Sequence, residues 1–413
     1  MPALEGIRTR IFEKCNMEME AFYRTHAYLV EHTNAPVRRV LMDEIDWNCR
    51  MIGIRGTRGV GKTTFLLQYA KEHFEPGDRS CLYVNINNFY FQGRSIADFA
   101  GEFYYKGGRT LLIDQVFKKD GWSKELKKCY DLYPRLKIVF SGSSVLTPDE
   151  DYPEIKDIVK TYNVRGFSFR EYLNLHTGTN FKPYTLDEII RDHTHIIKEI
   201  LPYVRPVEHF QSYIHHGFYP FHLEHRNFSE NLLKTMNMMT EVDILLIKQI
   251  ELKYLTKIKK LFYLLAVEGP KAPNVSMLAQ EVETSRATVM NYLKYLHDAR
   301  LINLLYHNGQ QWPKKPAKVM MHNPNLMYAI YPINVERQNL METFFVNAMW
   351  KDHKVSTSDK DGVYIIDGQK KYKVCQADKM SKTRVSADVI YARYGTEVGH
   401  DNQIPLWLLG FLF

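Results

Sequence analysis

The sequence predicts an α/β fold whose main domain is a parallel sheet covered by helices on both faces. Between about residues 50 and 147, short apolar runs alternate with stretches of helical character. Each run is almost wholly apolar, which is typical of strands buried on both faces of a sheet. The length of 413 residues indicates two or three domains, and 45% hydrophobic with 25% charged residues is an ordinary globular composition.

Four strands are expected in this sheet, in chain order after an N-terminal helix. The first fifty residues contain that helix and an entry segment that leads into the first strand. Helical stretches such as 63–74 and 123–133 separate the strands and supply the covering layers. The four apolar runs are residues 50–54, 81–86, 110–114 and 137–142.

The remainder of the chain is expected to be helical at first and mixed at its end. Pro and Gly punctuate helices between about 148 and 255, and a compact helical module with a following hairpin occupies about 256–310. The last hundred residues combine strand runs with a helix near 339–352. These residues are therefore expected to form a separate α/β domain.

Composition argues against several kinds of site. The five cysteines are far apart and show no CxxC spacing, and the sixteen histidines show no HExxH spacing, so neither a disulfide framework nor a zinc site is indicated. No apolar stretch approaches the roughly 20 residues that cross a bilayer, so we expect a cytoplasmic protein without a membrane partner. The net charge of +8 favours weak encounters with nucleic acid but identifies no partner.

The segment "GTRGVGKT", residues 56–63, matches the pattern G-x-x-x-x-G-K-[ST] between an apolar strand and a helix. Its glycines allow a tight turn in which backbone N–H groups and the helix N-terminus hold phosphate oxygens. Lys62 then reaches the β- and γ-phosphates, and the Thr63 hydroxyl binds Mg²⁺. No NKxD guanine motif is present, so ATP is the expected ligand. The residues expected to bind it are Gly56, Thr57, Arg58, Gly59, Val60, Gly61, Lys62, Thr63 and Thr64.

The run "TLLID" and the residue after it supply the metal side of the same site. Asp114 ends this strand and is expected, together with Thr63, to hold Mg²⁺. Gln115 stands where an ATP-hydrolysing enzyme usually carries the acid that activates water. Ser141, at the end of the next strand, lies where a polar side chain senses the γ-phosphate, although a strand-end turn explains it equally well.

Several segments together resemble prokaryotic AAA-type ATPases of the archaeal ATPase clan and the wider signal-transduction NTPases. They are "IGIRGTRGVGKTTFLLQYAKE", "GGRTLLIDQV", "LKIVFSGSS", "RGFSFREYLNL", "KIKKLFYLLA", "NPNLMYAI", "METFFVNAM" and "IPLWLLGFLF". The resemblance implies a P-loop NTPase core, a helical region, a winged helix and a C-terminal α/β domain of PD-(D/E)xK nuclease-like fold. The implied boundaries are 1–48 for an N-terminal helical entry segment, 49–175 for the P-loop ATPase core, 176–255 for a helical lid-like region, 256–312 for the winged helix and 313–413 for the nuclease-like domain.

The nucleotide site departs from the pattern of these relatives. They usually carry Glu after the strand-ending Asp, whereas Gln115 stands here, and an amide positions water without accepting its proton. They also tend to carry two arginines some way before the segment "FSFREYL". Asp157 and Ile158 occupy those positions, which leaves Arg165 and Arg170 as the nearby cations.

The C-terminal domain departs in the same direction. A PD-(D/E)xK nuclease needs an Asp and a Glu for its metal and a Lys beside the attacking water. Glu342 matches the acid of the helix, but the three strand positions are Val363, Lys373 and Gln376. Asp361 and Asp367 are candidate substitutes that are better explained as turn residues. We therefore expect no nuclease activity.

The segment 274–309 has the layout of a winged helix, namely two helices around a tight turn and then a hairpin. Ser276 and Ser285 are the expected N-caps, and an apolar stripe of Val289, Leu293 and Leu296 is expected to face the core. The opposite face is a candidate for contact with double-stranded DNA. Because it carries only two cations, packing between domains is the alternative. The candidate DNA-reading residues are Arg286, Thr288, Asn291 and Lys294, with Lys257, Lys259 and Lys260 on phosphates.

Three functions stay open at the level of the sequence. The first is an ATP-binding, AAA-like switch with impaired hydrolysis. The second is an active ATPase whose acid has been replaced by Gln115 to trap the nucleotide. The third is a winged-helix DNA-binding regulator. AAA-type rings complete their site with an arginine from a neighbour, so self-association also stays open.

Overall fold

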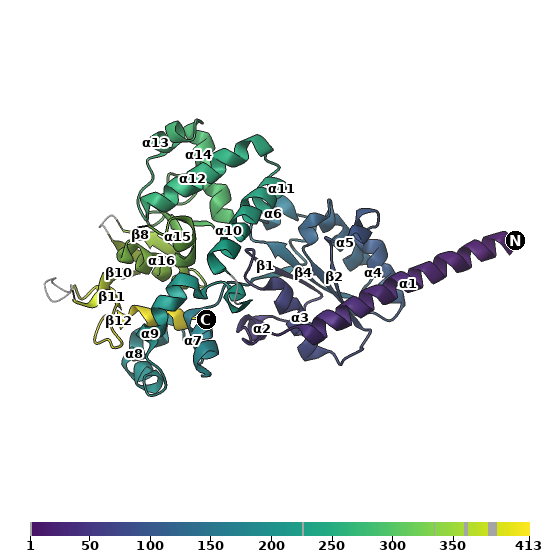
Figure 1. Cartoon of the computed structure of the whole chain (residues 1–413), viewed down its shortest axis with the longest axis horizontal. Coiled ribbons are helices and arrows are strands. Elements are labelled where there is room, and N and C mark those ends of the chain that lie inside the picture. The colour runs from purple at the N-terminus through teal and green to yellow at the C-terminus, as the bar shows by residue number, and fades with distance from the viewer. Residues whose placement is uncertain (1, 225–226, 334, 359–361, 379–385) are drawn as a thin grey trace. The chain divides into compact units, whose positions relative to one another are not determined.

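The computed structural model describes residues 2–224, 227–333, 335–358, 362–378 and 386–413, with side chains described from residue 17 onward (Figure 1). The chain divides into two compact units. The first comprises residues 1–57 and 61–165, and the second comprises residues 58–60 and 166–413. The division into five parts that the resemblance implies stays a prediction.

The first unit is built on a five-stranded sheet of order β2-β3-β4-β1-β5, in which all neighbouring strands run parallel. This confirms the parallel sheet and its four expected strands. The polar sequence of β5 gave no strand signal, and its pairing with β1 alone makes it a strand. The bounds are β1 Met51–Gly56, β2 Cys81–Asn85, β3 Thr110–Asp114, β4 Lys137–Ser143 and β5 Lys160–Asn163.

Helices pack around this sheet, as the apolar strands require. Helix α3 lies against β1, β2, β3 and β4, and the long helix α1 contacts α3 and β2 (Figure 1). Short 3-10 turns η1 and η2 follow β2 and β3. The bounds are α1 Pro2–His32, α2 Leu41–Glu44, α3 Lys62–His73, η1 Phe89–Gln92, α4 Ile96–Tyr105, η2 Val116–Lys118, α5 Trp122–Leu132 and α6 Pro148–Asp151.

The second unit begins with helices whose starts are fixed by side chains. Ser168 and Glu171 form a capping box at α7, and Thr185 and Glu188 form another at α8. The bounds are α7 Phe169–Thr177, α8 Leu186–Ile200, α9 Pro206–Ser212, η3 Tyr213–Gly217, η4 Pro220–Glu224, α10 Phe228–Met238, η5 Met239–Ile244, α11 Leu245–Ile247 and η6 Leu252–Tyr254.

A three-helix module with a hairpin follows, as the sequence indicated. It contains α12 Leu255–Glu268, α13 Val275–Glu281, α14 Arg286–Asp298 and the antiparallel pair β6 Ile302–Leu305 and β7 Lys318–Met321. Ser285 caps α14 as expected, since its side chain accepts from the Thr288 N–H. Ser276 is not a cap: Asn274 accepts from Met277 N–H and starts α13 two residues earlier, so Ser276 lies inside the helix.

The C-terminal part contains a mixed sheet of order β12-β11-β10-β9-β8. Strands β8, β9 and β10 pair antiparallel, whereas β10, β11 and β12 pair parallel. Helix α16 packs on β10 and also contacts α15 and the terminal 3-10 helix η8. The bounds are α15 Pro324–Ile330, α16 Arg337–Met349, β8 Val355–Thr357, β9 Val363–Ile366, β10 Lys370–Gln376, β11 Val389–Tyr394, β12 Gln403–Pro405 and η8 Leu406–Phe411.

Candidate functional site

The phosphate loop leaves β1 at its carboxyl end and enters α3 through Gly61. Gly59 and Gly61 have φ angles of 79° and 91°, which L-residues with side chains rarely adopt, so the loop requires glycine at both positions. The Lys62 ammonium donates to the carbonyl oxygens of Gly56 at 2.7 Å and Thr57 at 2.8 Å. The lysine side chain thus lies over its own loop.

Asp114 is the centre of a network of hydroxyl donors. The carboxylate is 1% exposed and accepts from Thr63 Oγ1 at 2.7 Å, from Tyr83 OH at 2.9 Å and from the Ser141 hydroxyl. Burial, with Asp114 beside it, raises the pKa of Tyr83 well above its usual range, so this phenol stays a proton donor. Because all three donors are neutral, they position the carboxylate without cancelling its charge.

This arrangement fits a magnesium ion. The Thr63 hydroxyl and the Asp114 carboxylate, expected from the sequence to hold the metal, are brought together by the first turn of α3 and the end of β3. Both are hard oxygen ligands of the kind that Mg²⁺ takes beside nucleotide phosphates. Thr63 is exposed and would hold the ion directly, while the buried Asp114 would orient that hydroxyl.

Gln115 has a left-handed backbone, with φ 58° and ψ 45°. Its N–H donates to Ser141 Oγ at 2.9 Å, and the same hydroxyl donates to Asp114. Ser141 is fully buried, so the residue expected as a γ-phosphate sensor ties the ends of β3 and β4 together in this structure. The Gln115 side chain is half-buried, and its amide cannot accept a proton as a carboxylate does.

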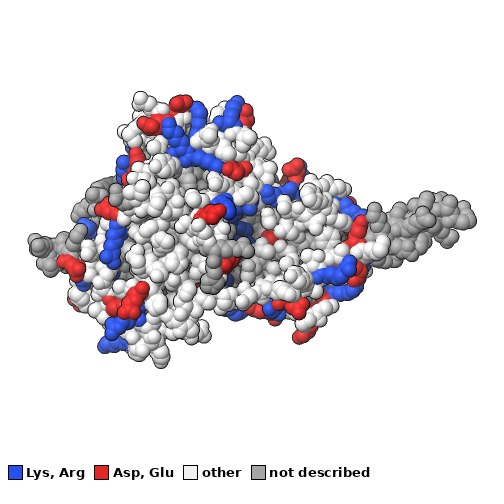
Figure 2. Space-filling model, viewed as in Figure 1, with Lys and Arg blue, Asp and Glu red and all other residues white. Residues whose placement is uncertain are grey.

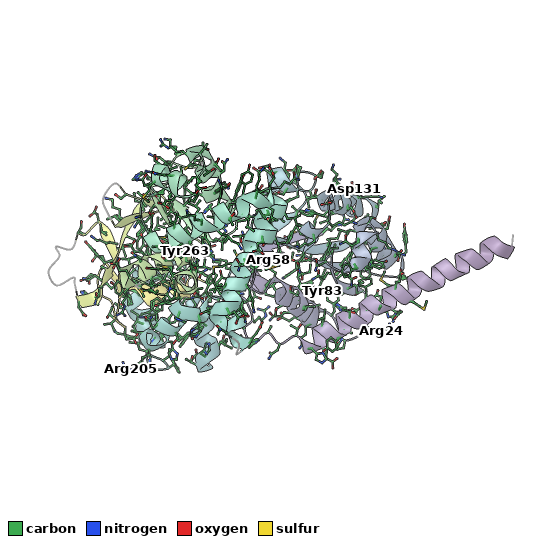
Figure 3. The ribbon with its side chains drawn as sticks, turned by 45° about the horizontal axis from the view of Figure 1, so that its top comes forward. Arg24, Arg58, Tyr83, Asp131, Arg205 and Tyr263 are labelled. Carbon is green, nitrogen blue, oxygen red and sulfur yellow. The ribbon has the colours of Figure 1, made fainter. Side chains whose placement is uncertain are left out.

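Residues 58–60, which the sequence predicts to be part of the nucleotide loop, belong to the second unit. Arg58, labelled in Figure 3, donates through Nε and Nη2 to Asp243 Oδ1 at 3.0 and 2.7 Å. The Asp243 side chain is only 3% exposed. Sequence reasoning missed Asp243, because a single acid within a helical stretch belongs to no motif. Val60 is fully buried, and Thr64 is exposed on the first turn of α3.

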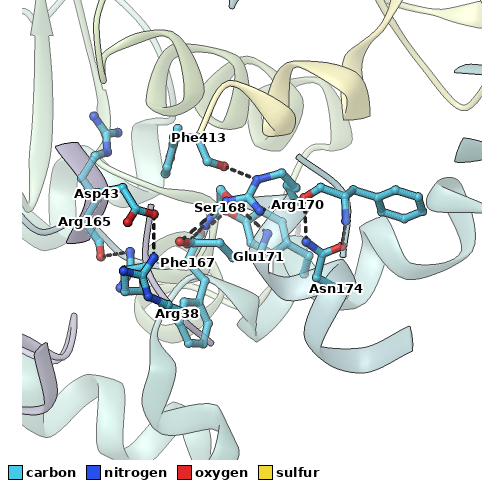
Figure 4. Close-up of polar contacts among 12 residues, drawn as sticks. Arg38, Asp43, Arg165, Phe167, Ser168, Arg170, Glu171, Asn174 and Phe413 are labelled. Carbon is cyan, nitrogen blue, oxygen red and sulfur yellow. Dashed lines mark hydrogen bonds and ion pairs between the residues drawn. The ribbon is translucent and has the colours of Figure 1, made fainter. Parts of the chain in front are cut away.

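Arg170 is one of the two cations that the sequence predicts near the nucleotide site. Its guanidinium donates hydrogen bonds to backbone carbonyls. Its Nε donates to Phe413 O at 3.1 Å and its Nη1 to Phe181 O at 3.0 Å, and the residue is 5% exposed (Figure 4). The guanidinium therefore fastens α7 to the last residue of the chain. The carbonyl of Arg165 accepts from Arg39 Nη2 at 2.8 Å.

Glu342, the acid that resembles a nuclease metal ligand, is neutralised by its own neighbours. Its carboxylate accepts from Lys318 Nζ at 2.9 Å, from Tyr364 OH at 2.5 Å and from Gln338 Nε2 at 2.9 Å. The Lys318 and Glu342 side chains are 15% and 11% exposed. An ammonium thus stands beside the carboxylate that a metal would otherwise use. Within the described ranges, no group of three His, Cys, Asp or Glu residues is arranged to hold a metal.

The other candidate nuclease positions form no acidic site. Val363 and Lys373 face each other across the antiparallel pair of β9 and β10, and Gln376 ends β10. Asp367 lies in the turn between these strands with φ 52°, accepts from Lys354 N–H at 2.8 Å and pairs with His353 at 2.7 Å, which fits the turn interpretation. Asp361 lies outside the described residues.

The helical module exposes few unpaired cations on the face expected to meet DNA. Arg286 and Asn291 are exposed on α14, but Lys294 pairs with Asp298, and Thr288 lies within hydrogen-bonding distance of the Ser285 cap. The other basic side chains are also engaged: Lys257 and Lys260 donate to backbone carbonyls, and Lys259 pairs with Glu241. In the view of Figure 2, basic and acidic side chains are interspersed over the visible surface. The apolar stripe of Val289, Leu293 and Leu296 is fully buried, as expected.

Two family models match the chain. Residues 48–173 match one described as "AAA domain", and residues 207–336 match one described as "Domain of unknown function (DUF8612)". With the phosphate loop at residues 56–63 and the parallel sheet, the first match supports an AAA-type, ATP-binding domain in this chain.

A curated relative and two solved structures are similar to the chain. The chain is 26% identical over 275 residues to "Uncharacterized protein MJ1637" of Methanocaldococcus jannaschii. This match covers 63% of this chain and 57% of the relative. PCH-2 of C. elegans is 18% identical with a TM-score of 0.23, over 38% of this chain and 42% of PCH-2. RuvB of Thermotoga maritima is 12% identical with a TM-score of 0.26, over 77% of this chain and 95% of RuvB. The chain therefore spans little more than half of the archaeal relative and less than half of PCH-2.

In the part of the chain that the structure describes, no helix has both the length and the apolar character to cross a membrane.

Proposed function

We propose that this protein binds ATP with Mg²⁺ at residues 56–64 and works as a nucleotide-dependent switch whose hydrolysis is slow. The observation that carries the proposal is that the two expected Mg²⁺ ligands, Thr63 and Asp114, are in contact, while the next residue, Gln115, carries an amide instead of a carboxylate. Thr63 Oγ1 lies 2.7 Å from Asp114 Oδ2, and Gln115 directly follows Asp114 in the chain. ATP is held and its metal is oriented, but no carboxylate at residue 115 takes the proton of the attacking water.

The chain carries a second matched region beyond its nucleotide core, and the proposed switch takes this region as its target. The "AAA domain" match covers the nucleotide core, whereas the other match lies wholly beyond residue 206. Residues 58–60 of the loop belong to the second unit, where Arg58 pairs with the buried Asp243. We propose that bound nucleotide orders these loop residues and with them the Arg58–Asp243 pair, and that association of copies accompanies this change.

A phosphate-release assay on the whole chain tests the proposal. We expect slow turnover in the unaltered chain and an increase of about 10²-fold in Gln115→Glu, because a positioned general base contributes roughly 10²–10⁴-fold. Gln115→Ala is the matched control and stays slow, since it has no base. Turnover in the unaltered chain that already equals that of Gln115→Glu would contradict the proposal.

The same experiment bears on the alternative of an active ATPase with a trapping substitution. Under that alternative the gene encodes Glu at residue 115, and reading its codon decides between the two. Nucleotide that co-purifies with the unaltered chain, identified by mass, is expected in both cases.

A second candidate function is DNA binding by the helical module, and it rests on the order of α12, α13, α14, β6 and β7 with exposed Arg286 and Asn291. Gel-shift binding to duplex DNA over a salt series tests it, because phosphate contacts make affinity fall steeply with salt. Absence of a shift at low salt excludes this function.

A further inference from the structure

Three residues of the phosphate loop, 58–60, belong to the second unit and make specific contacts in it. Arg58 pairs with the buried Asp243, and Val60 is fully buried. Gly59 lies between them in the chain and is in contact with aromatic side chains at and beside η4. The functions proposed above assign no role to this aromatic contact.

Phe221 and Tyr219 lie against the backbone of Gly59. A Cβ atom at Gly59 would lie 2.8 Å from Cε1 of Phe221 and 3.4 Å from Cδ1 of Tyr219. The ring of Phe221 thus fills the space that a side chain at residue 59 would need. Glycine is required here for two reasons, the φ angle of 79° and this close approach. The phenyl ring therefore limits the movement of the loop backbone towards η4.

The ring of Phe221 is itself held in place by its neighbours. It stacks on Tyr219 with ring centroids 5.3 Å apart and an interplanar angle of 21°, and its centroid lies 5.2 Å from that of Phe228. Tyr219 is fully buried, and its hydroxyl accepts from Asn323 Nδ2 at 3.2 Å. Closely packed rings resist displacement, so Phe221 forms a fixed wall for the loop.

His222, the residue after Phe221, attaches the same short helix to α7. Its Nε2 lies 3.1 Å from Nε2 of His176, and its Nδ1 lies 3.0 Å from the carbonyl oxygen of Tyr219. A neutral imidazole that donates from Nδ1 to the carbonyl accepts at Nε2, so both contacts are satisfied together. The segment that carries Phe221 is therefore anchored to α7 as well as to Asn323.

A phosphate loop binds through backbone N–H groups, so its affinity depends on the fraction of time that the loop spends in the binding conformation. Glycines make this conformation costly to hold, because they lose the most freedom when they are ordered. Three of the six residues 56–61 are glycines. Contacts that hold residues 58–60 before the nucleotide arrives reduce this entropic cost of binding.

We propose that Phe221 is a positioning residue for the triphosphate, which holds the backbone at Gly59 in the conformation that binds phosphate. The Arg58–Asp243 pair is the second anchor of the same loop residues. This role rests on the proposed function and adds regulation to it, because a change that displaces η4 lowers the affinity for ATP. By linkage, bound ATP stabilises η4 by the same free energy.

Competition binding with the full chain and a fluorescent ATP analogue tests the proposal. We expect Phe221→Ala to weaken the binding of ATP and of inorganic tripolyphosphate by the same factor, about tenfold, because the loop holds the phosphates. Phe221→Leu keeps an apolar side chain against Gly59 and is expected to retain most of the affinity. Phe181→Ala is the matched control, since it removes a half-buried phenyl whose ring packs on Tyr203 and Phe411. It is expected to bind ATP as the unaltered chain does.

Hydrogen exchange gives a second readout, which a purely structural role of Phe221 would not change. ATP is expected to slow the exchange of backbone amides at residues 218–222 in the unaltered chain, and this measurement needs no variant to fold. Unchanged ATP affinity in Phe221→Ala, an equal loss in Phe181→Ala, a loss for ATP alone, or exchange unaffected by ATP would overturn this role and leave the proposed function standing. Absence of ATP binding by the unaltered chain would overturn both.

Discussion

Asp114 in the first unit and Glu342 in the second are both buried carboxylates on α/β frames, and they differ in the charge of their donors. Asp114 accepts from the hydroxyls of Thr63, Tyr83 and Ser141. Glu342 accepts from the Lys318 ammonium as well as from Tyr364 and Gln338. Neutral donors leave a carboxylate able to attract a metal, whereas an ammonium occupies that role.

The difference shows why an acid at a motif position is weak evidence for a metal site. Both positions were found by comparison of sequence patterns, and both acids are present. What separates them is a lysine on β7, remote in sequence from the helix that carries Glu342. ATP binding near Asp114 is therefore expected to depend on Mg²⁺. Folding stability around Glu342 is expected to depend on its ion pair with Lys318.

The largest expected effect is on the free energy of unfolding, when the cation that pairs with Glu342 is removed. Lys318→Met removes the cation and leaves a buried carboxylate, which is expected to lower the free energy of unfolding by about 3–5 kcal/mol. Urea unfolding measures the change. Lys318→Met combined with Glu342→Leu is expected to regain much of the loss, because an apolar pair needs no counterion. A single variant as stable as the unaltered chain would show that the pair carries no such weight.

The next effect distinguishes the two carboxylates by function. Asp114→Asn is expected to weaken Mg²⁺-dependent ATP binding by about 10²-fold, because the metal loses the charge that orients it. Glu342→Gln is the matched change in the second unit and is expected to leave ATP affinity unaltered. Calorimetric titration with ATP, with and without Mg²⁺, measures both. Equal affinity in Asp114→Asn and the unaltered chain would remove Asp114 from the metal site.

The smallest effect uses one phenol from each network. Tyr83→Phe and Tyr364→Phe each delete one hydroxyl donor to a buried carboxylate, and each is expected to cost about 1–3 kcal/mol of folding free energy. Only Tyr83→Phe is expected to alter the Mg²⁺ dependence of ATP binding as well, by several-fold. The same change in both variants would mean that the two networks are not separate in function.

Much of the first unit could be predicted because its signals are local. The strand at Thr110–Asp114 was expected at its observed bounds, since an apolar run between polar turns needs no distant partner to be recognised. The phosphate loop is equally local, because strand, glycines, lysine and helix follow one another. The strand Lys160–Asn163 was missed for the opposite reason: its residues are polar, and only β1 beside it makes it a strand.

The candidate site was predicted in part for the same reason. Lys62, Thr63 and Asp114 belong to recognisable patterns, and the structure brings the last two into contact. Tyr83 and Asp243 belong to none. Each became visible only as the partner of a residue far along the chain, Asp114 and Arg58 respectively.

The sequence by itself determined the parallel sheet, the glycine loop and the amide at residue 115, because each follows from residues adjacent in the chain. Tertiary structure decided which groups surround each charged side chain. It surrounded Asp114 with hydroxyls, placed Lys318 beside Glu342 and bound Arg170 to the carbonyl of Phe413. The physical reason is that the behaviour of a charge depends on what lies within a few ångströms, and folding alone chooses those neighbours.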